Sequence, residues 1–240
     1  MIRIIIFLIC CCNIVYLFAD NDNASQINQI FNSNNDTPIP SIMDNYESYN
    51  RSMFAINMQL DCSVVRPVAV WYDNYMPNPL RYTANNFFNN LRDFVSLTDD
   101  MLQFRGLLSM QTFMRIAINS TLGIFGAIDI SSSLGLTVPK NSFGNTLKFY
   151  GWTNSSYFII PLLGPSTIRD TIGLIPDIYF NPIWHLLHNN YITVLLFAMD
   201  TVDIRASYLK TDDLLELSFD QYLTIKDLYT QSIENRNNNY

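Results

Sequence analysis

Hydrophobic residues recur at helical spacing through most of the chain. Between residues 80 and 95 the apolar positions lie three, four and seven apart, behind a Pro77-Asn78-Pro79 start that is typical of a helix N-terminus. The same spacing follows Gly106 and returns near the C-terminal end. The three series are Leu80, Ala84, Phe87, Phe88, Leu91 and Val95; Leu107, Met110, Phe113, Met114 and Ala117; and Leu214, Leu215, Tyr222, Ile225, Leu228, Tyr229 and Ile233.

Residues 191–209 predict one more helix, which carries Asp200, Asp203 and Arg205. Strand signals are poor, because two-residue turns flanked by alternating hydrophobic residues are absent and β-branched residues sit within helical spacings. Short helices divided by Gly and Pro are expected between residues 120 and 190. The pattern therefore predicts an all-α, single-domain architecture.

The N-terminus has the arrangement of an export signal. Residues 1–19 hold one cation, Arg3, and then a mostly apolar stretch from Ile4 to Phe18. At about fifteen residues this stretch is shorter than the roughly 20 that a membrane-spanning helix needs. The segment therefore predicts an exported protein rather than one held by a permanent helical anchor.

Two ways of processing this signal stay open. Cleavage after Ala19 would leave Leu17 at the −3 position, and it would remove three of the four cysteines. A lipoprotein signal would instead leave a lipidated Cys11 behind Leu8-Ile9-Cys10. Cleavage after Ala19 would leave only Cys62, which could not form an internal disulfide and is interpreted as a small, buried apolar residue on a helix.

Composition divides the rest of the chain. Residues 20–44 are rich in Asn, Ser and Pro and predict a flexible tether. Order is expected over residues 45–233, and residues 234–240 read as a disordered tail. No segment after residue 19 holds 18 consecutive apolar residues, so no conventional transmembrane helix is expected there.

The low charge content and negative net charge of the chain exclude some classes of binding partner. Only 15% of residues are charged, against roughly a quarter in an ordinary globular domain. The net charge is −7, and removal of residues 1–19, with Arg3 and no acid, makes it −8. Such a chain has no electrostatic footprint for nucleic acid, and any membrane contact would have to be apolar rather than polybasic.

The sequence offers no catalytic constellation. His185 and His188 are the only histidines, and their neighbours are Trp and Leu rather than Asp, Glu or Cys. A Gly-x-Ser-x-Gly elbow, a Gly-rich phosphate loop and a His-Glu-x-x-His pattern are all absent. We therefore expect no enzyme, no metal site and no cofactor.

The segment from Leu162 to Asp170 is the most patterned in the chain. Gly164-Pro165 predicts a turn, and Thr167 with Asp170 has the spacing of a helix capping box. A well-built helix entry explains this spacing fully. A helix N-terminus can also hold an anion, so Ser166, Thr167, Arg169 and Asp170 are candidates for contact with a lipid headgroup.

Several stretches, taken in order, resemble the VacJ/MlaA lipoprotein family. They are Tyr46 to Asn57, with a Glu-x-x-Asn-Arg start; Val65-Arg66-Pro67-Val68-Ala69; Asn85 to Leu91; Asn119 to Asp129, with glycines at 123 and 126; Phe143 to Leu147; Gly151; and Leu162 to Asp170. The resemblance covers roughly residues 46–210. The chain departs from the family in its poor lipobox and at Thr153 to Ser156, where the family is usually Gly-rich.

The resemblance implies a ring-like arrangement of amphipathic helices in the inner leaflet of the outer membrane, on its periplasmic side. It implies an amphipathic channel, association with trimeric porins, and hand-off of phospholipid to a periplasmic lipid carrier. The expected outcome is removal of mislocalised phospholipid from the outer leaflet, which maintains lipid asymmetry in the cell envelope.

The stretch from Tyr49 to Leu60 mixes apolar and polar residues as a channel wall or a membrane-seated helix would. Its candidate residues are Tyr49, Asn50, Arg51, Met53, Phe54 and Asn57. An ordinary amphipathic core helix has the same periodicity. Two other functions stay open, a periplasmic scaffold that binds porin or another envelope protein without moving lipid, and a periplasmic hydrolase, for which no nucleophile–base pair is found.

Overall fold

The computed structural model describes residues 42–186 and 190–238, which form two compact units. Among the described residues, unit 1 consists of residues 42–74, Ser155–Ile168 and residues 204–238. Unit 2 consists of Tyr75–Asn154 and Arg169–Asp203. The export signal, Cys11 and nearly all of the expected tether lie outside the described residues.

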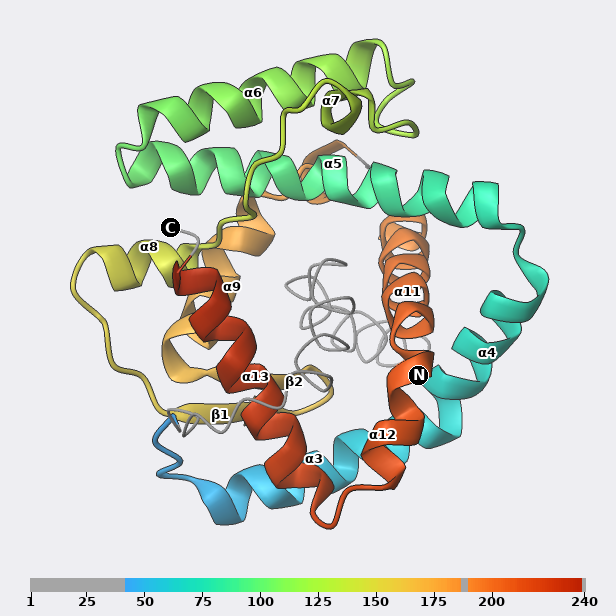
Figure 1. Cartoon of the computed structure of the whole chain (residues 1–240), viewed down its shortest axis with the longest axis vertical. Coiled ribbons are helices and arrows are strands. Elements are labelled where there is room, and N and C mark those ends of the chain that lie inside the picture. Colours follow the sequence, from blue (N-terminus) through green and yellow to red (C-terminus); the bar gives the residue numbers. More distant parts are fainter. Residues whose placement is uncertain (1–41, 187–189, 239–240) are drawn as a thin grey trace. The chain divides into compact units, whose positions relative to one another are not determined.

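Helices dominate both units, which confirms the predicted all-α class. Unit 1 contains α3 (Glu47–Leu60), the π-helix η2 (Asp61–Val65), α4 (Arg66–Tyr75), β1 (Tyr157–Ile160), β2 (Gly164–Thr167), the 3₁₀ turn η3 (Leu209–Thr211), α12 (Asp212–Glu216) and α13 (Gln221–Asn238). Unit 2 contains α5 (Asn78–Leu102), α6 (Gly106–Thr121), α7 (Ile130–Ser133), α8 (Phe143–Phe149), α9 (Ile168–Phe180), α10 (Ile183–Leu186) and α11 (Asn190–Ser207). Two of these helices cross the boundary, because the first residue of α9 and the last turn of α11 belong to unit 1. Figure 1 labels these elements.

In unit 1, the helices α3 and α4 are joined without a break through the π turn η2. Pro67 follows two residues after this turn. A proline ring inside an α-helix collides with the carbonyl group four residues earlier and donates no hydrogen bond, and a wider π turn relieves that conflict. Cys62 lies in this turn and is exposed, so its interpretation as a buried residue was wrong.

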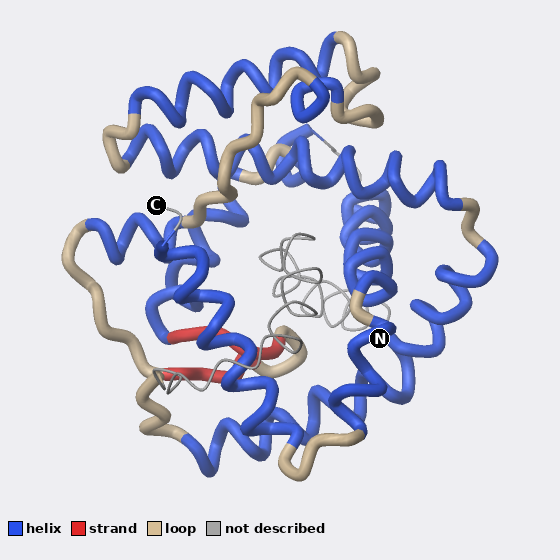
Figure 2. Tube along the Cα trace, in the orientation of Figure 1, coloured by secondary structure: helices blue, strands red, loops and turns tan. Residues whose placement is uncertain are grey.

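A small β-hairpin is the exception to the helical class. Strands β1 and β2 pair antiparallel, with Tyr157 opposite Thr167 and Ile160 opposite Gly164, and they are the two strands drawn in Figure 2 for the described chain. The connection bends through Leu162, whose φ of 68° lies in the left-handed region. Sequence patterning missed the hairpin because β1 is a four-residue apolar run without alternation, and β2 begins Gly-Pro, which strands disfavour.

The core of unit 1 forms where this hairpin meets α3 and α13. Tyr157, Ile159 and Tyr222 are almost fully buried, and Met53, Phe54 and Tyr229 pack against them. The ring of Tyr157 meets the rings of Tyr222 and Tyr229 edge to face, at centroid distances of 6.2 and 5.7 Å. Aromatic burial of this kind ties two short strands to two helices.

In unit 2, α5 and α6 lie side by side and run antiparallel (Figure 1). The predicted stripe on α5 faces the interior, where Ala84, Phe88, Leu91 and Val95 are buried. Pro77 and Pro79 flank the start of α5, in agreement with the sequence. Only Leu80, in the first turn, leaves its side chain largely exposed.

The helices α8 and α9 approach each other closely in unit 2 at a pair of glycines. A Cβ atom on Gly173 would lie 2.5 Å from the backbone nitrogen of Gly144. We therefore expect Gly173→Ala to lower the free energy of unfolding by about 1–3 kcal/mol through overpacking. Chemical denaturation would measure this, with Gly106→Ala as the control because no atom lies within 4 Å of the Cβ added there.

The last third of the chain differs from its sequence-based boundaries. The apolar series from Leu214 to Ile233 is divided between α12 and α13 by a loop at Leu217 to Asp220. Asp212 opens α12, as expected for an acid at the positive end of a helix. The last helix continues to Asn238, beyond the expected end of the ordered region at residue 233.

Candidate functional site

Two asparagines on α3 hold the backbone of the β-hairpin. Asn50, which is fully buried, accepts a hydrogen bond from Ile159 N at 2.8 Å and donates one to Tyr157 O at 3.2 Å. Asn57 accepts from Leu162 N at 2.6 Å and donates to Ile160 O at 3.0 Å. Each amide thus pairs with an N–H and a C=O of the hairpin, as a neighbouring strand would.

The spacing of these asparagines explains this two-point contact. Seven residues separate Asn50 from Asn57, which is about two helical turns, so both amides project from one face of α3. We call the pair the asparagine clamp. Its members are two of the six residues that the sequence singled out for a channel wall or a membrane seat.

The other four candidates on α3 also have partners within unit 1. Arg51 pairs with Glu47 at 2.8 Å and with Asp220 at 3.0 Å, and its guanidinium lies 4.4 Å from the ring centre of Tyr222. Met53 and Phe54 pack on the aromatic core, and Tyr49 stacks on Phe158. These contacts fit the core-helix interpretation of α3, while a channel role for these residues stays a prediction.

The headgroup candidates divide between the two units, and each is described in its own. In unit 1, Ser166 and Thr167 end β2 and are buried, and the Ser166 hydroxyl lies 3.3 Å from Thr167 O. In unit 2, Arg169 is buried, binds Asp170 at 2.9 Å and donates to the carbonyl oxygens of Trp152 and Thr153. The contacts of Arg169 are therefore internal, and contact with a headgroup stays a prediction.

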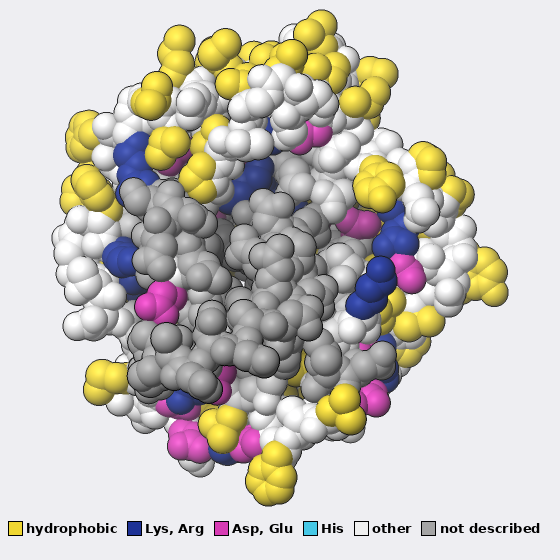
Figure 3. All heavy atoms as spheres, in the orientation of Figure 1, with side chains coloured by type: hydrophobic (Ala, Val, Ile, Leu, Met, Phe, Trp, Pro, Cys, Tyr) yellow, Lys and Arg dark blue, Asp and Glu magenta, His cyan; other side chains and the backbone are white. Residues whose placement is uncertain are grey.

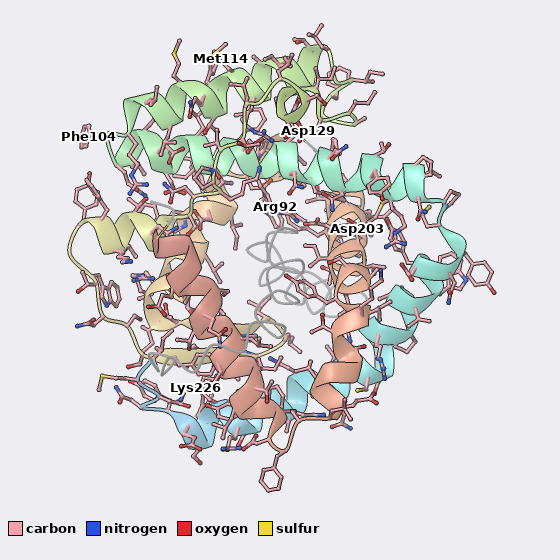
Figure 4. The ribbon with its side chains drawn as sticks, viewed as in Figure 1. Arg92, Phe104, Met114, Asp129, Asp203 and Lys226 are labelled. Carbon is pink, nitrogen blue, oxygen red and sulfur yellow. The ribbon has the colours of Figure 1, made fainter. Side chains whose placement is uncertain are left out.

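The helix α6 carries an exposed apolar surface that the sequence did not indicate as a functional site. Its apolar residues point to solvent, and Figure 4 shows Met114 and Phe104 directed away from α5. We define the α6 apolar face by Phe104, Leu107, Met110, Phe113, Met114, Leu122, Ile124 and Phe125, all of them exposed. Figure 3 shows hydrophobic side chains gathered along this edge of the molecule.

The opposite face of α6 buries polar residues. Thr112 donates to Asp100 at 3.3 Å, Arg115 pairs with Asp93 at 3.4 Å, and Asn119 donates to Ser131 at 2.9 Å. Thr112, Arg115 and Asn119 are all buried. The helix is therefore inverted, with its polar side inside and its apolar stripe outside, the reverse of a helix on a water-soluble core.

The backbone at both ends of α6 keeps large apolar side chains exposed at a conformational cost. Phe104, just before the helix, has φ of 57° and an exposed fraction of 85%. Ile124 and Phe125, just after it, have φ of 54° and 56° and are 65% and 78% exposed. Left-handed backbone is unfavourable for such residues, and above all for the β-branched Ile124, so strain here points to a function.

The turn after α6 is fixed by the motif that spans Asn119 to Asp129. Asn119 donates to Asp129 at 3.0 Å, and Asp129 in turn accepts from Ser131 and Ser132 at the start of α7. Gly126 has φ of 89°, which favours glycine. Figure 4 marks Asp129 at this end of α6. The motif therefore holds the strained loop that carries Ile124 and Phe125.

Neither a metal centre nor a membrane-spanning helix is found in the described parts of the chain. No group of three or more His, Cys, Asp or Glu side chains in residues 42–186 and 190–238 is arranged to hold a metal ion. In those same ranges, no helix combines the length and the apolar character that crossing a bilayer requires. His185 belongs to α10, and His188 lies outside the described residues.

Taken together, the fold and these surfaces define a mainly helical protein with a clamped β-hairpin and an inverted amphipathic helix. The chain belongs to the MlaA lipoprotein family, whose model matches residues 42–236. This finding confirms the family that the sequence motifs indicate.

Individual relatives and a solved structure are similar to most of the chain. The chain is 31% identical to an uncharacterised protein of Rickettsia felis over 88% of this chain and 85% of that protein. It is 30% identical to the intermembrane phospholipid transport system lipoprotein MlaA of Haemophilus influenzae, over 84% and 82% of the two chains. It also matches a solved chain from work on the structural basis for maintenance of bacterial outer membrane lipid asymmetry, with a TM-score of 0.69, 31% identity and coverage of 79% and 96%.

Proposed function

We propose that this protein transports phospholipid between membranes of the cell envelope, working from the outer membrane with its α6 apolar face in contact with lipid. Relatives that match this chain over most of their own length are named intermembrane phospholipid transport system lipoproteins, and the matched structure concerns outer membrane lipid asymmetry. The observation that carries the proposal is the inverted α6, which exposes apolar residues on strained backbone. Large exposed apolar patches mark interaction with other proteins or with membranes.

Lipid rather than water explains the distribution of residues on α6. Each large apolar side chain gains about 1.5–3 kcal/mol when it leaves water, and Leu107, Met110 and Phe113 form one continuous stripe. A helix with one apolar face lies in the membrane interface with that face toward the acyl chains, and the α6 apolar face suits this position. We propose that this face is seated in the inner leaflet of the outer membrane.

The need for a protein in lipid transfer follows from the cost of exposing the acyl chains to water. Two acyl chains of about 16 carbons would cost on the order of 25 kcal/mol to expose to water, at roughly 0.8 kcal/mol per methylene group. A protein that shelters the chains accelerates their transfer without any bond being made or broken, so no catalytic group is required. We propose that lipid leaves the outer leaflet, that a trimeric porin is the membrane partner, and that a periplasmic carrier accepts the lipid.

Mass spectrometry of the membrane-extracted mature protein tests transport. In the native state we expect bound phospholipid that a membrane protein of similar size does not carry. After denaturation, the mass distinguishes a chain that begins with an acylated Cys11 from one that begins at Asp20. A protein that is found in the soluble periplasm and carries neither lipid nor acyl group would overturn the proposal and favour a non-transporting scaffold.

Depth measurement in liposomes tests the membrane seat on α6. An environment-sensitive dye on Phe113→Cys, in a Cys62→Ser background, should be quenched several-fold more by acyl-chain quenchers than the same dye on Asp73→Cys. Both positions are exposed, but only Phe113 belongs to the α6 apolar face. Equal quenching at the two positions would show that α6 does not enter the hydrocarbon.

A further inference from the structure

Two buried carboxyl groups meet in unit 2, where α5, α8 and α9 come together. Asp99 of α5 is 2% exposed and Asp177 of α9 is 4% exposed, and they accept hydrogen bonds from Thr146 and Phe143, which lie three residues apart at α8. An ionised carboxylate only accepts hydrogen bonds. Two ionised carboxylates in one buried cluster repel each other, so we expect one member of the pair to carry a proton.

The remaining contacts of the pair connect it to α8. Asp99 accepts a hydrogen bond from the Thr146 hydroxyl at 2.9 Å, and Thr146 in turn accepts one from the Gln103 amide at 2.8 Å. Asp177 accepts from Phe143 N, the first backbone amide of α8, at 3.0 and 3.3 Å. Both carboxyl groups thus bind α8, one from the end of α5 and the other from α9.

The charged residues next to Asp99 and Asp177 do not favour ionisation of both carboxyl groups at once. Asp100 acts on Asp99 and Asp170 acts on Asp177, and both are acidic. Further out, Arg105 and Asp93 act on Asp100, Arg169 pairs with Asp170, and Lys148 is the basic residue in the last turn of α8. Burial raises the pKa of Asp177 to about 9, with the charge of Asp99 adding to the effect, and burial raises the pKa of Asp99 to about 7.

We propose that Asp99 and Asp177 form a proton-operated latch that holds α5, α8 and α9 together while the pair keeps a proton and loosens when both groups are ionised. Without the proton both buried groups are charged and repel each other, which strongly disfavours their burial together. The start of α8 depends on Asp177, so it loosens with the pair. This latch stands independently of lipid transport.

The direction of the pH effect follows from proton linkage. An aspartate in an unfolded or open segment ionises near pH 4, whereas the pair in the closed state holds its last proton up to a pH of about 9. Between these limits the closed state binds more protons than the open one, so its stability falls as pH rises. The contribution of the latch is complete below about pH 4 and is lost progressively toward pH 9.

Hydrogen–deuterium exchange on the detergent-solubilised full chain tests the latch. Between pH 6 and pH 9, after correction for intrinsic exchange, we expect protection of residues 143–149 to fall at least tenfold in the wild-type protein, since each pH unit can change the opening equilibrium up to tenfold. Asp177→Asn and Asp99→Asn supply an amide donor in place of the proton, so protection there should stay nearly constant. Asp73→Asn, an exposed carboxyl outside the pair, should keep the wild-type response.

A second measurement uses the wild-type protein alone and so does not depend on folding of the variants. Infrared difference spectroscopy should show a protonated carboxyl band at pH 7 that disappears as pH is raised toward 10. Wild-type protection of α8 that does not change with pH would overturn the proposal. The same conclusion would follow from the absence of the carboxyl band at neutral pH, or from a wild-type pH response in both Asn variants.

Discussion

Replacing Arg205 by alanine is expected to lower the free energy of unfolding by about 3–5 kcal/mol, the loss that follows when one partner of a buried ion pair is removed. Arg205 in α11 contacts Asp61 of η2 through two hydrogen bonds of 2.9 Å, and it contacts Asp212 of α12 at 3.0 Å. All three side chains are largely buried. The substitution leaves two carboxylates of unit 1 without this cation, and chemical denaturation of the solubilised protein would measure the loss.

Arg66→Ala is the matched control for this prediction. Arg66 binds the same carboxylate, Asp212, at 3.0 Å, but its side chain is 39% exposed. An exposed ion pair contributes about 0–1 kcal/mol, so the control should unfold almost as the wild type does. If the two variants lost equal stability, burial would not be what makes the Arg205 contact important.

The second large effect is expected at the asparagine clamp. Asn50→Ala removes both hydrogen bonds that Asn50 makes with β1, and it leaves Tyr157 O and Ile159 N without this partner in a buried place. Each of these two buried backbone groups that loses its partner costs about 1–3 kcal/mol, so we expect a loss of about 2–6 kcal/mol. Denaturation should report the loss, and exchange of the hairpin amides should accelerate at Ile159.

Asn45→Ala provides the comparison for the clamp. Asn45 also reaches the hairpin region, through a hydrogen bond of 2.8 Å to Ser156, but that contact is exposed to water. Its removal should change stability by less than about 1 kcal/mol, since water replaces the lost partner. A small effect of Asn50→Ala, similar to that of Asn45→Ala, would contradict the assignment of Asn50 as the residue that holds β1.

Much of the fold could be predicted because helical periodicity is a local property of the chain. The stripe from Ala84 to Val95 identified α5, and the Pro77-Asn78-Pro79 start identified where it begins. The β-hairpin could not be predicted, because its second strand has unfavourable residues and is held by the distant asparagines of α3. The sequence selected Asn50 and Asn57 as site candidates without indicating that they bind a backbone.

The candidate membrane surface shows the limit of patterning most clearly. Leu107, Met110 and Phe113 have the same spacing as the buried residues of α5, yet they lie on the outside of unit 2. Periodicity reports that a helix has two unlike faces, but it does not report which face meets the rest of the protein. That choice depends on the partners of the polar face, and for α6 these are Asp93 and Asp100, from the neighbouring helix α5.

The sequence by itself therefore determined the helical class, the family and the acidic, weakly charged character of the chain, since these depend on composition and on residues near one another. Tertiary structure alone decided that α6 is inverted, that Asn50 and Asn57 act as a clamp, and that Asp99 and Asp177 are buried together against α8. Each of these features joins residues from separate elements of one unit. Their chemistry arises from burial and from distances that only the folded chain establishes.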